Sequence, residues 1–164
     1  MSYEDQLNAL GLELPPIPKP ASAYIPVVRT GNLLFLSGII PSINGKLQFR
    51  GKVGRELTLE EGQEAARITA LNALSVIKGE LGSLDGVQRI VRVSVHIASA
   101  EGFSEQSKVA DGASNLLLDI FGEAGRHARL ALGAAELPFF APIELEMIVE
   151  VAGVAMATPN EPLP

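Results

Sequence analysis

The chain has 164 residues, a length that suits one compact domain with a sizeable apolar core. The absence of cysteine excludes disulfide bonds, a thiol nucleophile and a cysteine-bound metal site. A net charge of −6, no Trp and only two Tyr disfavour a nucleic-acid partner, because such a partner requires clustered basic residues and stacking side chains. No apolar run is long enough to cross a bilayer and no secretory signal pattern is present, so we expect a cytoplasmic protein without a membrane partner.

The first predicted elements are a short helix, an extended arm and a β-hairpin. Residues 3–12 are expected to be helical, and the proline-rich residues 13–23 are expected to form the arm. Two apolar strands, at 24–28 and 33–38, flank the turn-forming sequence RTGN, a pattern typical of a hairpin. The more polar residues 45–51 are predicted to add a third strand.

Two long helices are predicted on either side of the clearest strand. The first is predicted to begin at Thr58, where Thr58 and Glu61 have the spacing of a capping box, ahead of apolar residues at helical spacing. The strand at 87–99 alternates apolar and polar side chains, which is typical of a strand with one buried face. The second helix is predicted over 101–122, with its final glycine as the stop.

The element order, βββ-α-β-α-ββ, indicates an α+β fold in which one mixed sheet carries both long helices on one face. The opposite face then has no cover, and the strand at 87–99 is expected to present Ile90, Arg92, Ser94 and His96 there. Because a half-apolar exposed sheet face favours association, we expect a homo-oligomer with cyclic symmetry.

Neither an internal repeat nor a linker interrupts the chain. We therefore expect three regions: the N-terminal helix and proline-rich arm at 1–21, a single domain at 22–154, and a flexible tail at 155–164.

Charged residues interrupt the last two predicted strands, which meet at a turn near Pro138. Strand alternation directs the leucines of the first strand to the core, and directs Arg129 and Ala131 to the other face, together with Glu144 and Glu146 of the second. If the two strands form a hairpin, Ala131 faces Glu144, and Arg129 lies diagonally from Glu144 at roughly 7–8 Å. A cation and a carboxylate would then border a hollow. Ordinary cross-strand ion pairs have the same spacing, so a purely structural role also stays open.

The remaining polar candidates are weaker. The two histidines, His96 and His127, are too far apart in the sequence to indicate a metal site, so no metal is expected. His96 is expected at an oligomer interface. Ser37 precedes a glycine, but no G-x-S-x-G sequence and no triad partners accompany it, which disfavours a serine hydrolase.

The sequences YIPVVRTGNLLFLSGIIP (24–41) and ARLALGAAELPFFAPIELEMI (128–148) resemble the N-terminal hairpin and the C-terminal signature of the reactive intermediate deaminase (Rid) family, also described as YjgF-like or endoribonuclease L-PSP-like. The resemblance covers about residues 22–153. It implies a chorismate-mutase-like fold and a homotrimer with its sites in clefts between subunits. It also implies hydrolysis of short-lived 2-imino or enamine acids to 2-keto acids and ammonia, with no metal or cofactor.

The resemblance implies roles for individual residues as well. Arg129 aligns with the arginine that grips the substrate carboxylate, a task that suits the parallel donors of a guanidinium. Glu144 aligns with the glutamate that positions and activates the attacking water. Tyr24, Ser37 and Gly38 align with residues that line the pocket, where the serine and the glycine backbone hold the imine nitrogen or the developing oxygen.

The chain departs from the family pattern at two site positions, which indicates a divergent branch. Ala131 replaces a common pocket cysteine. His127 replaces a proline and becomes a candidate for the pocket rim, although a helix-end or solvent position is favoured for it. Two other functions stay open on the same fold: a non-catalytic sensor of small carboxylates, and an endoribonuclease, which the acidic charge disfavours.

Overall fold

The structure is a computed structural model that describes residues 1–153. In these residues the α-helices are α1 (Tyr3–Ala9), α2 (Leu59–Leu81) and α3 (Gln106–Phe121). One sheet has the strand order β1-β2-β7-β5-β6 and contains β1 (Val27–Thr30), β2 (Leu33–Leu36), β5 (Val87–Ala98), β6 (Ala128–Ala134) and β7 (Ile143–Val151). A separate small hairpin consists of β3 (Ser42–Ile43) and β4 (Lys46–Leu47), and the 3-10 turns are η1 (Leu84–Gly86), η2 (Gly122–Gly125) and η3 (Pro138–Phe140).

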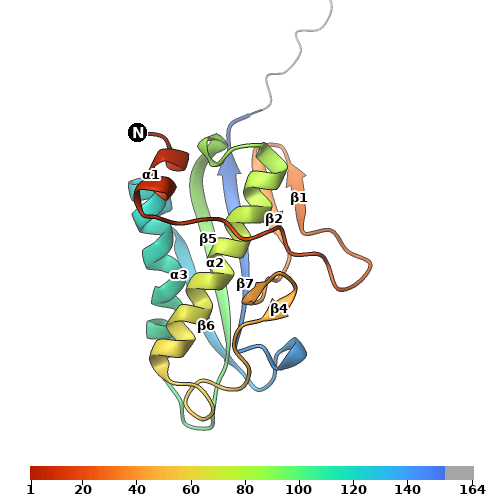
Figure 1. The fold of residues 1–164 in the computed structure, drawn as a ribbon, viewed down its shortest axis with the longest axis vertical. Helices are drawn as coiled ribbons and strands as arrows, with labels where there is room; N and C mark the ends of the chain where they lie inside the picture. The colour runs from red at the N-terminus through yellow and green to blue at the C-terminus, as the bar shows by residue number, and fades with distance from the viewer. Residues whose placement is uncertain (154–164) are drawn as a thin grey trace, which may run out of the picture.

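The predicted α+β architecture is confirmed. Helices α2 and α3 lie on one face of the sheet, and no helix of residues 1–153 covers the other (Figure 1). The sheet is mixed, because β5 and β6 are parallel and the other neighbours are antiparallel. We call the face without helices the open face. It exposes apolar side chains, among them Val28, Phe35 and Leu132, which are 51%, 40% and 46% exposed.

Helix α2 begins and ends at the residues that favour its termini. Thr58 Oγ1 accepts a hydrogen bond from Glu61 N at 3.1 Å, and Glu61 Oε2 accepts one from Thr58 N at 2.8 Å, which confirms the predicted capping box. The helix stops at Gly82, whose φ of 82° lies in the left-handed region. Where α2 contacts α3, a Cβ on Gly112 would overlap the backbone of Gln63, so the two helices approach closely only because residue 112 is glycine.

The N-terminal helix and arm are docked on the domain. Helix α1 is shorter than predicted and buries Leu7 in the core. The arm then crosses α2 (Figure 1), where Ser75 Oγ donates a hydrogen bond of 2.7 Å to the Pro15 carbonyl. The Ile17 side chain occupies the space beside the Cα of Gly79, which a larger residue would fill. The arm is therefore attached to α2 at two successive points.

Two predictions, one for residues 45–51 and one for Ile90 of β5, are wrong. Residues 45–51 add no strand to the main sheet, because only Lys46 and Leu47 are extended and they pair with β3. Ile90 faces the core instead of the open face, because the register between β5 and β7 shifts on both sides of it. Beyond this irregularity Arg92 and His96 lie on the open face, as predicted.

The predicted hairpin of the last two strands is also wrong. Strand β6 is an edge strand parallel to β5, and β7 lies antiparallel on the other side of β5. The residues between β6 and β7 therefore cross the end of β5 instead of making a tight turn. This pairing reverses the predicted faces of β6. Arg129 and Ala131 align with the buried Val93 and Val95 on the helix-covered face, while the leucines of β6 lie on the open face.

The predicted tail at 155–164 lies outside the described residues. No helix in residues 1–153 combines the length and the apolar character needed to span a membrane.

Candidate functional site

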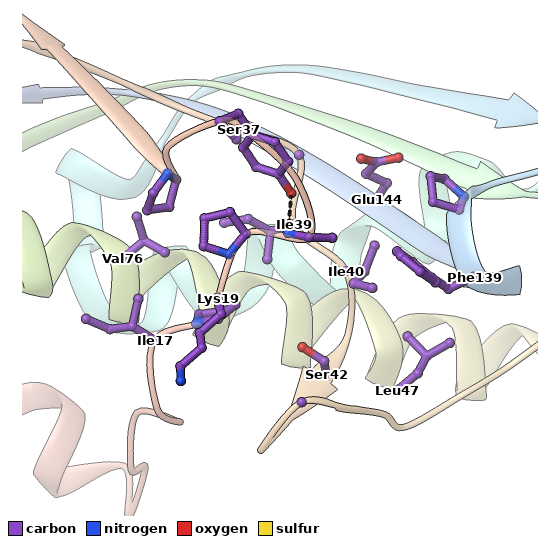
Figure 2. Close-up of a pocket in the computed structure, with 18 of the residues that line it drawn as sticks. Ile17, Lys19, Ser37, Ile39, Ile40, Ser42, Leu47, Val76, Phe139 and Glu144 are labelled. Atoms are coloured by element: carbon purple, nitrogen blue, oxygen red, sulfur yellow. Dashed lines mark hydrogen bonds between the residues drawn. The ribbon is translucent and has the colours of Figure 1, made fainter.

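A pocket of about 960 Å³ lies beside the start of β7 (Figure 2). Its walls come from the N-terminal arm, the residues that follow β2, the β3–β4 hairpin and the η3 turn. Four of the predicted site residues line it: Tyr24, Ser37, Gly38 and Glu144. The structure thus brings together the part of the predicted site that comes from the N-terminal hairpin and the glutamate of the last strand.

Glu144 packs directly on Gly38. Ile39 and Leu145 exchange backbone hydrogen bonds of 2.8 and 2.9 Å in an antiparallel bridge, which brings the segment that contains Gly38 beside the start of β7. The Glu144 carboxylate fills the space above the Gly38 Cα, where a Cβ would overlap Oε1, so this arrangement requires glycine. Glu144 is half-buried and forms no ion pair or side-chain hydrogen bond within residues 1–153, so its carboxylate can accept hydrogen bonds from water or a ligand.

Ser37 and Gly38 offer an acceptor and a donor beside that carboxylate. The Ser37 hydroxyl donates its proton to the Ile25 carbonyl at 2.7 Å, which leaves its oxygen lone pairs for a ligand N–H. The Gly38 N–H makes no backbone hydrogen bond within the described residues, so it can donate to a ligand oxygen. Tyr24 is 46% exposed and forms part of the wall near the arm, where its hydroxyl accepts a long hydrogen bond of 3.4 Å from Ala21 N.

The η3 turn forms the wall near Glu144, and sequence reasoning missed its special conformation. Phe139 and Phe140 both have left-handed backbones, with φ of 60° and 58°. Each such residue costs about 1–3 kcal/mol and must be held in place by its surroundings. Arg50 Nη1 donates to the Phe139 carbonyl at 3.1 Å, and Gly51 N donates to the Phe140 carbonyl at 2.9 Å. The segment after β4 therefore holds the backbone of the turn from which Phe139 borders the pocket.

Arg129 does not line this pocket. Its guanidinium bonds to α3: Nη1 donates to Asp111 Oδ1 at 2.7 Å and to Ser114 Oγ at 3.1 Å, and Nη2 donates to Ser107 Oγ at 2.7 Å. Because β5 separates β6 from β7, the predicted proximity of Arg129 and Glu144 within one protomer is wrong. A guanidinium has five N–H donors, so these three bonds leave two, and the side chain is 23% exposed.

His127 and Ala131 lie with Arg129 and not with the pocket. Ala131 packs against the core. His127 Nδ1 is 2.6 Å from the Gly125 carbonyl, which can only accept, so Nδ1 carries the proton and Nε2 accepts the Ser114 hydroxyl at 3.0 Å. Burial of the ring lowers the pKa of His127 below its ordinary value, and the positive charge of Arg129 acts in the same direction. His127 is thus half-buried in the Arg129 network instead of lying at the pocket rim.

Three partners of Arg129 were not predicted from the sequence. Ser107, Asp111 and Ser114 are spaced i, i+4 and i+7 along α3, which places them on one face of that helix. A polar stripe at this spacing inside SKVADGAS was the signal that could have located them. No comparable signal marks Ile17, because an extended arm has no fixed periodicity.

Comparison with known proteins finds similarity over most of the chain. Residues 4–150 match the family described as "YjgF/chorismate_mutase-like, putative endoribonuclease". The protein TCP17 of Trypanosoma cruzi is 44% identical over 146 residues, which are 88% of this chain and 91% of that protein. The solved structure of Atu1372 from Agrobacterium tumefaciens is 40% identical, with a TM-score of 0.85 and coverage of 92% of both chains. A Shewanella oneidensis protein described as a "putative endoribonuclease" is 35% identical, with a TM-score of 0.89 and coverage of 92% of this chain and 100% of that one.

Proposed function

The chain belongs to the YjgF/chorismate-mutase-like family, and on that premise we propose that it hydrolyses small reactive 2-imino or enamine acids to 2-keto acids and ammonia. The observation that carries this proposal is the Glu144 carboxylate, which has no ion-pair partner within residues 1–153 and lies at one end of the pocket against Gly38. A carboxylate in this position can accept a proton from water. The hydroxyl oxygen of Ser37 and the N–H of Gly38 supply complementary polar contacts.

In the proposed reaction the substrate enters as a protonated imine, with its C=N carbon facing Glu144. Water adds to that carbon while Glu144 accepts one of its protons, which forms a C–O bond and a tetrahedral amino alcohol. Ser37 Oγ accepts the N–H of the imine, and the Gly38 N–H donates to the new oxygen. Glu144 returns the proton to nitrogen, and the C–N bond breaks as the C=O bond forms. The hydroxyl proton passes to the departing ammonia, so that the 2-keto acid and ammonium leave. No atom changes its oxidation state, because the reaction exchanges a C=N bond for a C=O bond by hydrolysis.

Arg129 can take part in this site only from a neighbouring subunit. Within one protomer its guanidinium bonds to α3, but two of its five donors stay free, and β6 is at the edge of the sheet. The exposed apolar side chains of the open face support association into the homotrimer that we propose. In that assembly the free donors of Arg129 from one subunit hold the substrate carboxylate above Glu144 of the next, with Tyr24 completing the wall.

The proposal is tested by generating 2-imino acids in solution and measuring whether the protein accelerates their loss. No acceleration over buffer for any imine would overturn it. Saturable binding of 2-keto acids without turnover would instead identify a non-catalytic sensor. For the endoribonuclease named among the relatives, RNA cleavage would be the decisive observation, but Lys19 and Arg50 are the only cations among the described pocket-lining residues.

A further inference from the structure

The pocket is much larger than the smallest substrates of the proposed reaction. Its volume of about 960 Å³ lies at the upper end of the roughly 300–1,000 Å³ that is typical of sites for drug-sized ligands. A three- or four-carbon imino acid that is held at Glu144 would leave most of this space unfilled. The remaining space is therefore available to the part of the ligand that does not react.

The two ends of the pocket differ in chemistry. Figure 2 shows Glu144 and Phe139 at one end, and Ile17, Lys19 and Val76 at the other. The far end is bordered by aliphatic side chains and by the prolines of the arm. The ammonium group of Lys19 points away from Glu144, so the part of Lys19 that faces the pocket is its carbon stem (Figure 2).

The far wall belongs to a segment that the fold holds in place. Ser75 bonds to the Pro15 carbonyl at 2.7 Å, and Ile17 packs on Gly79 of α2. Prolines on both sides of Ile17 restrict the backbone of the arm further. A preformed wall loses little entropy when a ligand binds to it, so contacts with this wall can discriminate between ligands.

From these observations we infer that the pocket prefers 2-imino acids with a bulky apolar side chain, and that Ile17 of the arm is a specificity-determining residue. The inference rests on the proposed function for the identity of the reacting group. The C=N carbon lies at Glu144, and the side chain of the substrate extends between Ile17 and Val76 at the far end.

The test compares imines generated by an amino-acid oxidase from alanine, leucine and phenylalanine. For the wild-type protein we expect kcat/KM to be at least about tenfold higher for the leucine or phenylalanine imine than for the alanine imine. Ile17→Trp, which fills the far end, should lower this ratio by about tenfold, and Ile17→Ala should lower it by several fold. Leu10→Trp is the matched control, because Leu10 is also an exposed aliphatic residue before the domain but does not line the pocket.

A binding measurement separates this inference from the deaminase proposal. Calorimetry with phenylpyruvate and pyruvate reports size preference without turnover. If small imines are hydrolysed as fast as bulky ones and Ile17→Trp leaves the ratio unchanged, the specificity inference is wrong and the deaminase stands. If no imine is hydrolysed but phenylpyruvate binds more tightly and Ile17→Trp removes this preference, the apolar end is supported and the deaminase is wrong. If neither turnover nor a binding preference is found, both are wrong.

Discussion

The carboxylate of Glu144 lies on the Cα of Gly38, so a side chain from the last strand and the backbone after the second strand form one surface of the pocket. This contact joins two segments that are more than a hundred residues apart in the sequence, and it depends on the absence of a single carbon atom. It also offers a direct way to move the carboxylate without removing it.

Gly38→Ala tests that contact. The added Cβ would overlap Glu144 Oε1, the end of a flexible side chain, so we expect the carboxylate to be displaced and stability to fall by about 1 kcal/mol, the low end of the usual cost of overpacking. Imine hydrolysis should fall by about a hundredfold, because misplacement of a catalytic group by about 1 Å has an effect of this size. Rates and thermal unfolding check both expectations. Gly153→Ala is the control, since nothing lies near its Cβ position. Full activity in Gly38→Ala would show that the position of this carboxylate is unimportant.

Glu144→Gln removes the proposed base but retains the shape of the side chain. We expect kcat to fall by roughly 10²–10⁴-fold, the usual contribution of a general base, with little change in stability. The control is Glu146→Gln, two residues further along the same face of β7 and outside this pocket. A Glu144→Gln protein with wild-type kcat would exclude the proposed role in proton transfer.

Mixing two inactive variants tests whether the site is shared between subunits. In trimers assembled at random from equal amounts of Arg129→Ala and Glu144→Gln chains, about a quarter of the sites would combine an intact Arg129 with an intact Glu144 from the next subunit. We therefore expect about a quarter of the wild-type activity after the two proteins are unfolded together and refolded. Tagged subunits confirm that exchange has occurred. If exchanged trimers remain inactive, Arg129 does not complete the site of a neighbour.

His127 should make the stability of the protein depend on pH. Its pKa is lowered in the folded state, mainly by burial, so the unfolded chain takes up this proton at a higher pH than the folded one. Stability is therefore lost as the pH falls below the ordinary value of 6.5 towards the lowered pKa of the folded state. His127→Gln keeps a neutral donor and acceptor and should reduce this loss. Urea unfolding at roughly pH 7.5 and pH 5 measures it. An equal loss of stability in both proteins would contradict the assignment.

Local sequence patterns predicted the helices well, because the interactions that start and stop a helix join residues that are close in the sequence. Thr58 and Glu61 satisfy each other's backbone groups within one turn, so the start of α2 could be located without tertiary information. The site residues that line the pocket could also be predicted from the sequence. Ser37, Gly38 and Glu144 belong to segments that resemble a known family, and the sheet brings these segments together.

The position of Arg129 could not be derived in the same way. Alternation shows which side chains of a strand share a face, but it does not show which strand is its neighbour. The leucines of β6 suggested that their face was buried in the core, yet they lie on the open face. Beside Arg129, the helix-covered face of β6 accepts only small side chains. At Gly133 a Cβ would already approach Gln106 Nε2 to 3.0 Å. The short chain of residues between β6 and β7 resembled a hairpin connection, although it crosses the end of β5.

The arm contributes a wall to the pocket but no strand to the sheet, so the shape of the pocket can change while the strand order stays the same. Natural variation or a designed graft can exchange residues 16–21 while the scaffold that carries Glu144 stays intact. A protein in which a shorter segment replaced residues 16–21 would keep the Glu144 carboxylate but have an open groove where the arm now forms a wall. The ligand range of such a shortened form would therefore be a poor guide to that of the whole chain.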